Sequence, residues 1–311
     1  MLNSVSSVVK KPRRYTECGT EFLFTLRYMK HLFLITTLLL SLSLFAQKKQ
    51  PYVLYDAKGK KLSYEKMMKR LTDKDVLLFG EYHNNAIAHW LQLEVTKDVK
   101  EKRELVLGAE MFEQDNQEAL DLYLAGTIKQ KQLDSMARLW KNYPTDYAPL
   151  VNFAKENKIA FAATNVPRRY ASMVSRGGFA VLDTLSAKEK NWMAPLPIMY
   201  DAELPGYKKM IEMMGGHGGE NLPKAQALKD ATMAFFILKY HRPGTMLIHY
   251  NGAYHSDYYD GINWYLKKQN PTLKIVTIST VSQKNIHQLE KEHIGKADFI
   301  ICVDEDMTNT Y

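Results

Sequence analysis

Cysteine is nearly absent from this sequence, which has 311 residues and two cysteines, Cys18 and Cys302. Because we expect Cys18 to be removed with the N-terminal leader described next, one cysteine would remain. A single cysteine excludes both an internal disulfide and a cluster of thiolate metal ligands. Internal repeats and low-complexity segments are also lacking.

An apolar run long enough to span a membrane is missing as well. Met29 and Lys30 precede an apolar segment over residues 32–40, and the small residue Ala46 follows it. This segment falls short of the about 20 residues that a spanning helix needs, and its layout is typical of a secretory signal peptide. We predict a signal peptide over residues 29–46, with residues 1–28 as an upstream extension, and favour it over a membrane anchor.

Export has consequences for location and charge. Gln47, not a lipid-bearing cysteine, would follow the cleavage point, so we expect a periplasmic or cell-envelope protein that is not a lipoprotein. The full chain has a formal net charge of +8, and removal of residues 1–46, which hold six Lys and Arg and two acidic residues, leaves +4. This charge is too small to indicate a nucleic-acid partner.

Short apolar runs alternate with longer amphipathic ones along the rest of the chain. The pattern predicts strands over residues 76–79, 105–109, 159–163, 245–250 and 273–278, and helices over 85–102, 114–124, 130–140, 148–157, 222–241 and 258–270. Strands separated by helices predict an α/β fold with a mostly parallel sheet flanked by helices.

The domain boundaries follow from this pattern. Residues 47–74 read as a lead-in and residues 75–311 as one α/β domain. Residues 182–221 hold several prolines and a run of four glycines around His217, so they cannot form one regular element. We predict a smaller helical cap over residues 168–240, because long irregular connections are often lids or binding loops.

Two Gly-x-x-His motifs follow predicted strands, at Gly80–His83 and at Gly252–His255. Ligands of parallel sheets bind beyond the carboxyl ends of the strands, so these motifs mark a candidate site. Glu81 and His83 suit an acid–base pair or a metal ion. One such motif alone would be an ordinary turn after a strand, and its recurrence favours a functional role.

Charged residues follow two further strands. Glu110 comes directly after the strand over 105–109, where a carboxylate is costly to bury without a partner. Arg168 and Arg169 follow the strand over 159–163, and one of them could pair with Glu110. The alternatives are a helix cap for Glu110 and surface positions for both arginines.

Six segments together resemble the ChaN family of haem-binding, iron-regulated proteins, part of a wider group with erythromycin esterases, TraB and Tiki proteins. They are Gly80–His83, Gly108–Phe112, Asn165–Arg169, Pro205–Tyr207, Gln226–Ala234 and Asn251–His255. The resemblance implies an α/β domain that binds haem between two protomers, with a tyrosine on the iron and a histidine from across the dimer. It also suggests an outer-membrane haem transport system as a partner.

Carried onto this chain, the resemblance implies Tyr207 as the ligand of the haem iron and His217 as the partner histidine. Tyr207 follows a stiff Pro-Gly entry, and Tyr143, Tyr147 and Tyr200 are weaker candidates. A tyrosinate is a known ligand of ferric haem.

The wider group implies an alternative function, an esterase or peptidase that uses a divalent metal ion to activate water. Its catalytic set would combine the sheet-end residues Glu81, His83, Glu110, Arg168 and His255. The two readings use different parts of the chain.

Overall fold

A seven-stranded sheet forms the centre of the computed structural model, which describes residues 27–31, 33, 49–213 and 219–311. The strand order is β1-β7-β6-β2-β5-β3-β4, and every pair is parallel except β1 with β7. The strands are β1 Tyr52–Asp56, β2 Val76–Glu81, β3 Leu105–Glu113, β4 Ala160–Asn165, β5 Met246–Gly252, β6 Ile275–Gln283 and β7 Phe299–Asp304. The predicted α/β fold is confirmed.

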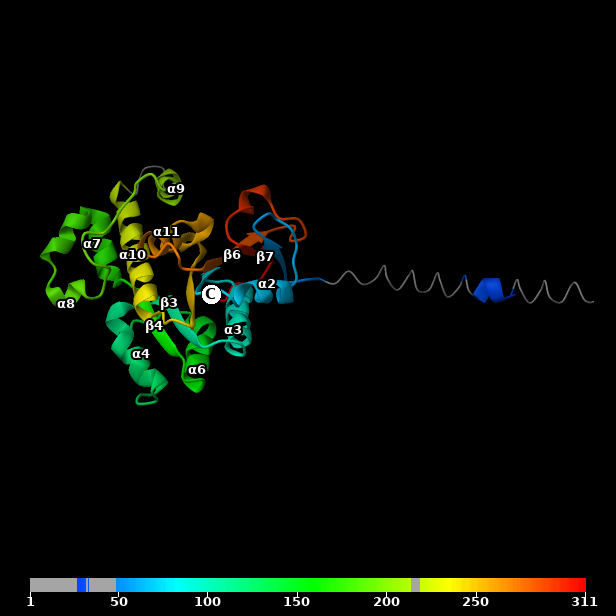
Figure 1. Cartoon of the computed structure of the whole chain (residues 1–311), viewed down its shortest axis with the longest axis horizontal. Coiled ribbons are helices and arrows are strands. Elements are labelled where there is room, and N and C mark those ends of the chain that lie inside the picture. Colours follow the sequence, from blue (N-terminus) through cyan, green and yellow to red (C-terminus); the bar gives the residue numbers. More distant parts are fainter. Residues whose placement is uncertain (1–26, 32, 34–48, 214–218) are drawn as a thin grey trace, which may run out of the picture. The chain divides into compact units, whose positions relative to one another are not determined.

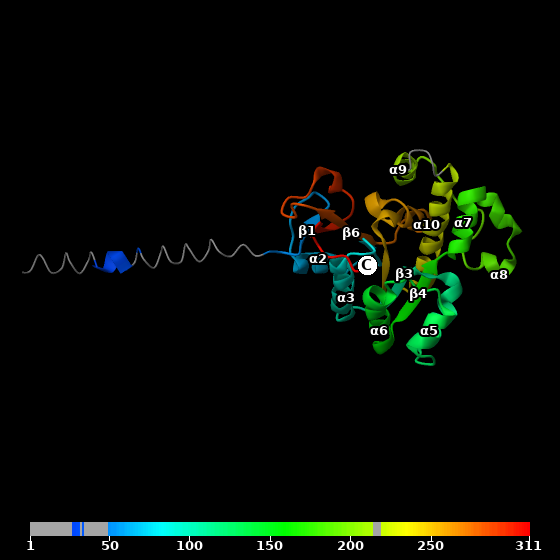
Figure 2. The ribbon, with the colours of Figure 1, turned by 180° about the vertical axis from the view of Figure 1, so that it is seen from behind.

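Helices cover both faces of the sheet (Figures 1 and 2). They are α2 Tyr64–Leu71, α3 Ala86–Lys100, α4 Gln117–Leu124, α5 Gln130–Met136, α6 Ala148–Glu156, α7 Arg168–Gly177, α8 Ala187–Lys190, α9 Pro205–Met213, α10 Asn221–Tyr240 and α11 Ile262–Gln269. Side chains alternate along each strand. Leu77 and Phe79 therefore join the core under α3 and α6, while Val76 and Leu78 join the core under α7 and α10.

The structure differs from the sequence-based expectation in two places, the predicted lead-in and the predicted cap. The predicted lead-in over residues 47–74 contributes β1 and α2, and β1 pairs with β7 near the end of the chain. Within the predicted cap, α10 packs directly on β4 and α7, so it belongs to the helical layer of the sheet. The segment before it supplies α9, which begins at Pro205.

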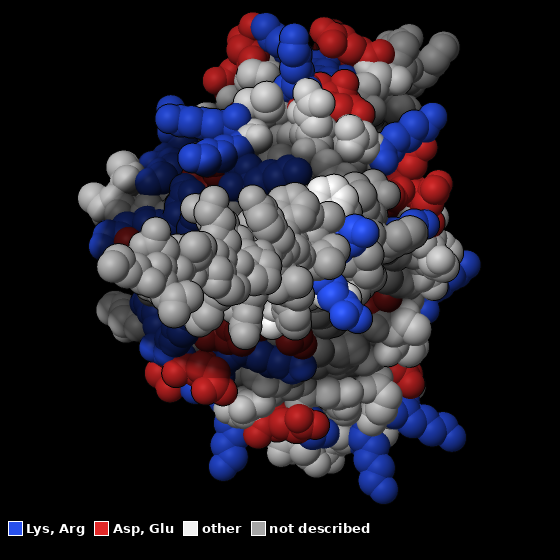
Figure 3. Space-filling view, turned by 90° about the vertical axis from the view of Figure 1, so that its right-hand side faces the viewer, with Lys and Arg blue, Asp and Glu red and all other residues white. Residues whose placement is uncertain are grey.

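The chain divides into residues 1–50, of which 27–31 are helical, and a unit of residues 51–311. Most of the predicted signal peptide over 29–46 lies outside the described residues. Within the described ranges, no helix combines the length and apolar character that crossing a bilayer requires. Lys and Arg are interspersed with Asp and Glu over the face shown in Figure 3, a mixture that is common on proteins in water.

Candidate functional site

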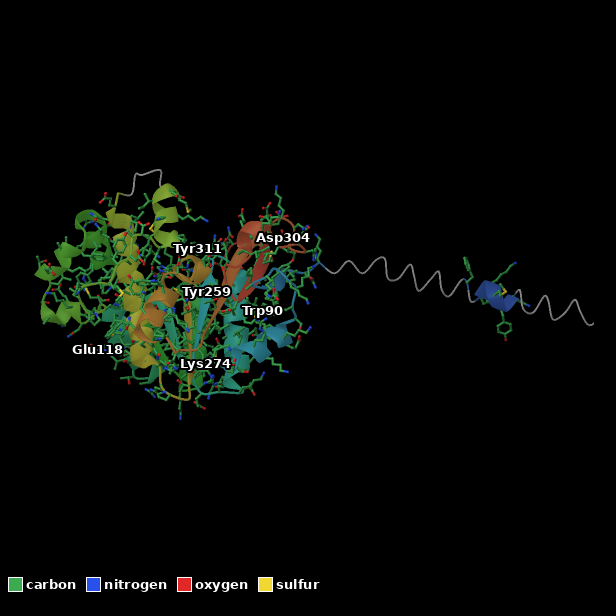
Figure 4. The ribbon with its side chains drawn as sticks, turned by 45° about the horizontal axis from the view of Figure 1, so that its top comes forward. Trp90, Glu118, Tyr259, Lys274, Asp304 and Tyr311 are labelled. Carbon is green, nitrogen blue, oxygen red and sulfur yellow. The ribbon has the colours of Figure 1, made fainter. Side chains whose placement is uncertain are left out.

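A pocket of about 920 Å³ lies at the carboxyl ends of the central strands. Its walls come from the residues after β2 and β5, from α9, and from the loop that carries Lys296. Figure 4 shows Tyr259 and Tyr311 at the end of the sheet where the strands finish, with Lys274, directly before β6, at the other end. This is the edge at which open parallel sheets bind ligands.

The first Gly-x-x-His motif forms a carboxylate–imidazole pair on the pocket wall. His83 Nδ1 lies 2.8 Å from Glu81 Oε1. Burial lowers the pKa of His83, but the hydrogen bond to Glu81 and the charges of Glu110 and Glu81 together outweigh this effect and raise it. The other edge of the ring packs over the backbone of β5, where a Cβ on Gly252 would lie 2.9 Å from the imidazole Nε2. Gly252 therefore serves close packing of His83.

The carboxylate of Glu81 is held from the opposite side by three residues for which the sequence predicted no such role. The Tyr147 hydroxyl donates to Oε1 at 2.7 Å, and the side-chain amide of Gln92 donates to Oε2. His89 Nδ1 lies 3.6 Å from the same Oε2. The hydroxyl of Tyr147 is therefore buried and already donates a hydrogen bond to Glu81.

The second motif places His255 between two buried carboxylates. Its Nε2 lies 3.1 Å from Glu110 Oε1, and its Nδ1 lies 2.5 Å from Asp230 Oδ1. A carboxylate at each ring nitrogen favours the imidazolium form, in which both nitrogens donate and the ring carries a positive charge. Burial lowers the pKa of His255, and the charges of Glu110 and Asp230 outweigh burial and raise it to about 9.

The two carboxylates around His255 respond differently. Burial raises the pKa of Glu110, but the charge and hydrogen bond of His255, the charge of His83 and the backbone N–H of Gly252, which donates to Glu110 Oε2 at 2.7 Å, together outweigh burial. The net pKa of Glu110 is lowered. For Asp230, which lies on α10, burial dominates and the pKa is raised. Glu110 and His255 therefore form an ionised buried pair, with Asp230 as its neighbour.

The predicted partner of Glu110 is wrong. Arg168 is exposed at the first position of α7 and does not line the pocket, and Arg169 pairs with Asp115 at 2.7 Å. The positive charge that compensates Glu110 comes from His255. The sequence predicted that His255 belongs to the same site but did not predict that it pairs with Glu110. The structure thus brings together Glu81, His83, Glu110 and His255, and leaves Arg168 outside.

Tyr207 does not face the pocket. Its side chain is 3% exposed, and its hydroxyl donates to Asp230 Oδ2 at 3.1 Å. Its ring stacks on Tyr200, with centroids 5.7 Å apart. Burial and the nearby charge of Asp230 raise its pKa, which opposes ionisation. In this arrangement the hydroxyl is unavailable to a metal in the pocket, and His217 lies outside the described residues.

Other tyrosines line the pocket instead. Tyr254 donates to the Gly206 carbonyl at 2.5 Å, and Tyr258 donates to the Glu292 carbonyl at 2.8 Å. Tyr82, inside the first motif, is 37% exposed, and its hydroxyl has no hydrogen-bond partner within the described part of the chain. Burial raises the pKa of Tyr82, and the charge of Lys296 acts in the opposite direction.

The predicted divalent metal ion among the sheet-end residues is not supported. Each histidine of the two motifs points a ring nitrogen at a carboxylate, and His255 uses both. No three ligand atoms of Glu81, His83, Glu110 and His255 lie within 4.8 Å of one another, as a metal ion would require. These residues form ion pairs and hydrogen bonds rather than an open coordination sphere.

The parallel sheet and the pocket at its carboxyl edge define an α/β protein with a ligand site of cofactor size. The profile of the haem-binding uptake proteins of the Tiki superfamily, ChaN, matches residues 67–266, and the chain belongs to this family. The resemblance in the six sequence segments is confirmed. No curated protein sequence matches the chain.

Several solved structures are similar to this chain, and the first of them shares its fold. ChaN of Campylobacter jejuni, described with cofacial haem binding, has 19% identity and a TM-score of 0.62, with 81% of this chain and 97% of that chain covered. A Bacillus cereus protein has 10% identity and a TM-score of 0.45 over 78% and 92% of the two chains. A toxin effector domain of Vibrio vulnificus has 15% identity and a TM-score of 0.40 over 78% and 37%.

Proposed function

We propose that this protein binds haem in the pocket at the carboxyl edge of the sheet and serves haem or iron acquisition. Family membership supports this function. The volume of about 920 Å³ is in the upper part of the range for small-molecule and cofactor sites, about 300–1,000 Å³. The observation that carries the proposal is Tyr82 on the wall of a pocket of this size, with a hydroxyl that has no hydrogen-bond partner among the described residues.

The lining of the pocket suits the chemistry of haem. Met213 and the tyrosine rings offer apolar and aromatic surface to a flat macrocycle. Lys209 is exposed at the rim, and Lys296 lies on the wall in an ion pair with Asp257 at 3.2 Å. Both ammonium groups could receive the carboxylates of haem propionates. When bound, haem would supply the iron for storage or transfer.

We propose Tyr82 rather than Tyr207 as the residue that holds the haem iron. Ligation needs an accessible phenolate. Tyr82 lines the pocket, and although burial raises its pKa on balance, the charge of Lys296 acts in favour of the phenolate. Tyr207 would have to give up its hydrogen bond to Asp230 and leave a buried position.

Titration with hemin tests both parts of the proposal. The wild-type protein should shift the Soret band and show the charge-transfer absorption of a tyrosinate complex. Tyr82→Phe should lose that absorption and weaken binding at least about tenfold, which corresponds to about 1.4 kcal/mol. Tyr254→Phe is the matched control, because Tyr254 lines the same pocket and its hydroxyl already has a backbone partner.

Two outcomes would contradict these statements separately. If wild type binds no hemin, the proposed function is wrong. If Tyr82→Phe binds hemin as wild type does and Tyr207→Phe loses the tyrosinate absorption, haem binding remains supported and Tyr207, the ligand expected from the sequence, holds the iron. Hemin binding that survives both changes would exclude both tyrosines.

Dimerisation, export and the transport partner are further parts of the proposal. A haem held between two protomers should raise the measured mass from that of one chain to that of two, so the titration should be paired with native mass spectrometry. Cleavage after Ala46 predicts a mature N-terminus at Gln47, which N-terminal sequencing of the protein from its host would show. Retention of mature protein in the cytoplasm would contradict export and a role beside an outer-membrane haem transporter.

Hydrolysis is less well supported. His255 is a poor candidate for a base, because both ring nitrogens face carboxylates and its pKa is raised to about 9, which favours the protonated ring at neutral pH. The pair of Glu81 and His83 could orient a water molecule, but no serine, threonine or cysteine nucleophile lines the described pocket. A cleavage assay with model esters, repeated with His83→Ala, would reveal such activity.

A further inference from the structure

A short turn beside the haem pocket brings two carboxylates and one imidazole together. Glu290 precedes the 3₁₀ turn η6, Lys291–His293, and Glu292 lies within it. One carboxylate oxygen of each glutamate and one ring nitrogen of His293 all lie within 4.8 Å of one another. From this geometry we propose a second site, which binds a divalent first-row transition metal ion through Glu290, Glu292 and His293.

The His293 side chain gives an independent reason for a ligand here. It is 6% exposed, and its Nδ1 is buried without a hydrogen-bond partner among the residues described. A buried polar nitrogen without a partner costs about 1–3 kcal/mol, and native proteins rarely leave one. A bound ion is one of the few groups that would satisfy a ring nitrogen among carboxylates.

Hydrogen bonds hold the backbone of this turn in place before any ion binds. In a 3₁₀ turn, residues three apart lie on the same face, which places Glu290 beside His293. The His293 N–H closes the turn on the Glu290 carbonyl at 3.0 Å. The Glu290 N–H donates to Gln283 at 3.1 Å, and the Tyr258 hydroxyl donates to the Glu292 carbonyl at 2.8 Å. The turn is thus anchored to β6 and to the pocket wall.

The donor set determines the class of ion. One imidazole and two carboxylates suit Zn²⁺, Co²⁺, Mn²⁺ and Fe²⁺, whereas Ca²⁺ and Mg²⁺ prefer oxygen ligands alone and Cu⁺ prefers sulfur. Lys296, whose charge acts on His293, is already paired with Asp257 at 3.2 Å, so its repulsion of a metal ion is largely offset. Both glutamates are exposed, which leaves open positions for water.

The experiment measures Zn²⁺ and Co²⁺ binding to the purified, tag-free and haem-free protein by isothermal titration calorimetry, with the visible spectrum of the Co²⁺ complex as a second signal. One ion should bind per chain. Glu290→Gln with Glu292→Gln should weaken binding by more than about 100-fold, since outer-shell partners alone are worth about 10–100-fold. Glu118→Gln on α4 is the matched control, because Glu118 is also exposed and lies far along the chain from η6.

The changed glutamates are exposed, so the double variant should keep its thermal stability without metal. His293→Leu provides a third arm: it should also abolish binding, and its fold should survive because Nδ1 has no partner to lose. No uptake of either ion by wild type would overturn the proposal. Wild-type affinity in the double variant would overturn it as well, and so would competition between metal and hemin, which would place the ion in the haem pocket.

Discussion

The buried imidazolium of His255 makes the stability of this protein depend on pH above neutrality. The pKa of His255 in the folded protein is about 9, against about 6.5 in an unfolded chain. The stabilisation from its two carboxylate partners is fully present below about pH 6.5 and is lost as the pH rises through 9. Integrated over this range, the free energy of unfolding should fall by about 3 kcal/mol.

Urea denaturation at a series of pH values between 6 and 10 would measure this effect. His83 also has a raised pKa and would add a slope of the same sign. The measurement should therefore be made in His83→Gln, in which the remaining slope reports mainly on His255. The chemical shifts of the imidazole ring give the pKa directly. A flat free energy of unfolding from pH 6.5 to 9.5, or a ring that titrates near 6.5, would refute the doubly paired imidazolium.

Further predictions concern acid stability and packing around the same site. Burial lowers the pKa of His249 to about 4, so stability should also fall from about pH 6.5 towards 4, as urea midpoints would show. Gly252→Ala should displace the imidazole packed over it and cost about 1–3 kcal/mol in chemical denaturation. Gly261→Ala should lower the free energy of unfolding by more than about 3 kcal/mol, because the new Cβ would lie 2.3 Å from the His255 carbonyl oxygen. Gly295→Ala is its control: φ is also positive there, but the new Cβ would meet no atom within 4 Å, so the cost should be about 1–2 kcal/mol. Tyr207→Phe removes a donor from a buried carboxylate and should lower stability by about 1–3 kcal/mol.

The sequence could predict where the site lies because it is tied to strand ends. The runs before Gly80 and Gly252 are apolar and short, and both motifs begin where the apolar pattern stops. Polar side chains at those points must share one edge of a parallel sheet. In the structure β2 and β5 are neighbours, with Glu81 opposite Gly252. That β2 and β5 are neighbours could not be predicted from the sequence, because the order of strands in a sheet depends on how the crossover connections run.

The partners of these residues were harder to predict because they come from helices. Asp230 lies 25 residues before His255 on α10, and no periodic pattern links the two. A signal was nevertheless present: Asp230 stands on a helix whose neighbours Ala227, Ala231 and Ala234 are apolar. A carboxylate on a buried helical face requires a charged partner.

The pairing of β1 with β7 shows a different limit. Val53 lies opposite Cys302, almost 250 residues later in the chain. A strand of five residues has little internal pattern, and an antiparallel edge can pair with any exposed strand of suitable length. The sequence therefore predicts the parallel strands at the centre of the sheet but not the antiparallel strand β1 at its edge.

The last residues of the described chain return to the site. Thr310 donates through its backbone to the Asn84 carbonyl at 2.9 Å and through its hydroxyl to Asp146 at 2.7 Å, and Tyr311 lines the pocket. Anything attached after Tyr311 would therefore start at the mouth of the cavity. A fluorescent dye attached there would lie within quenching range of haem in the pocket and would report haem binding and release in real time. A bulky purification tag at the same place would obstruct the entrance of the pocket.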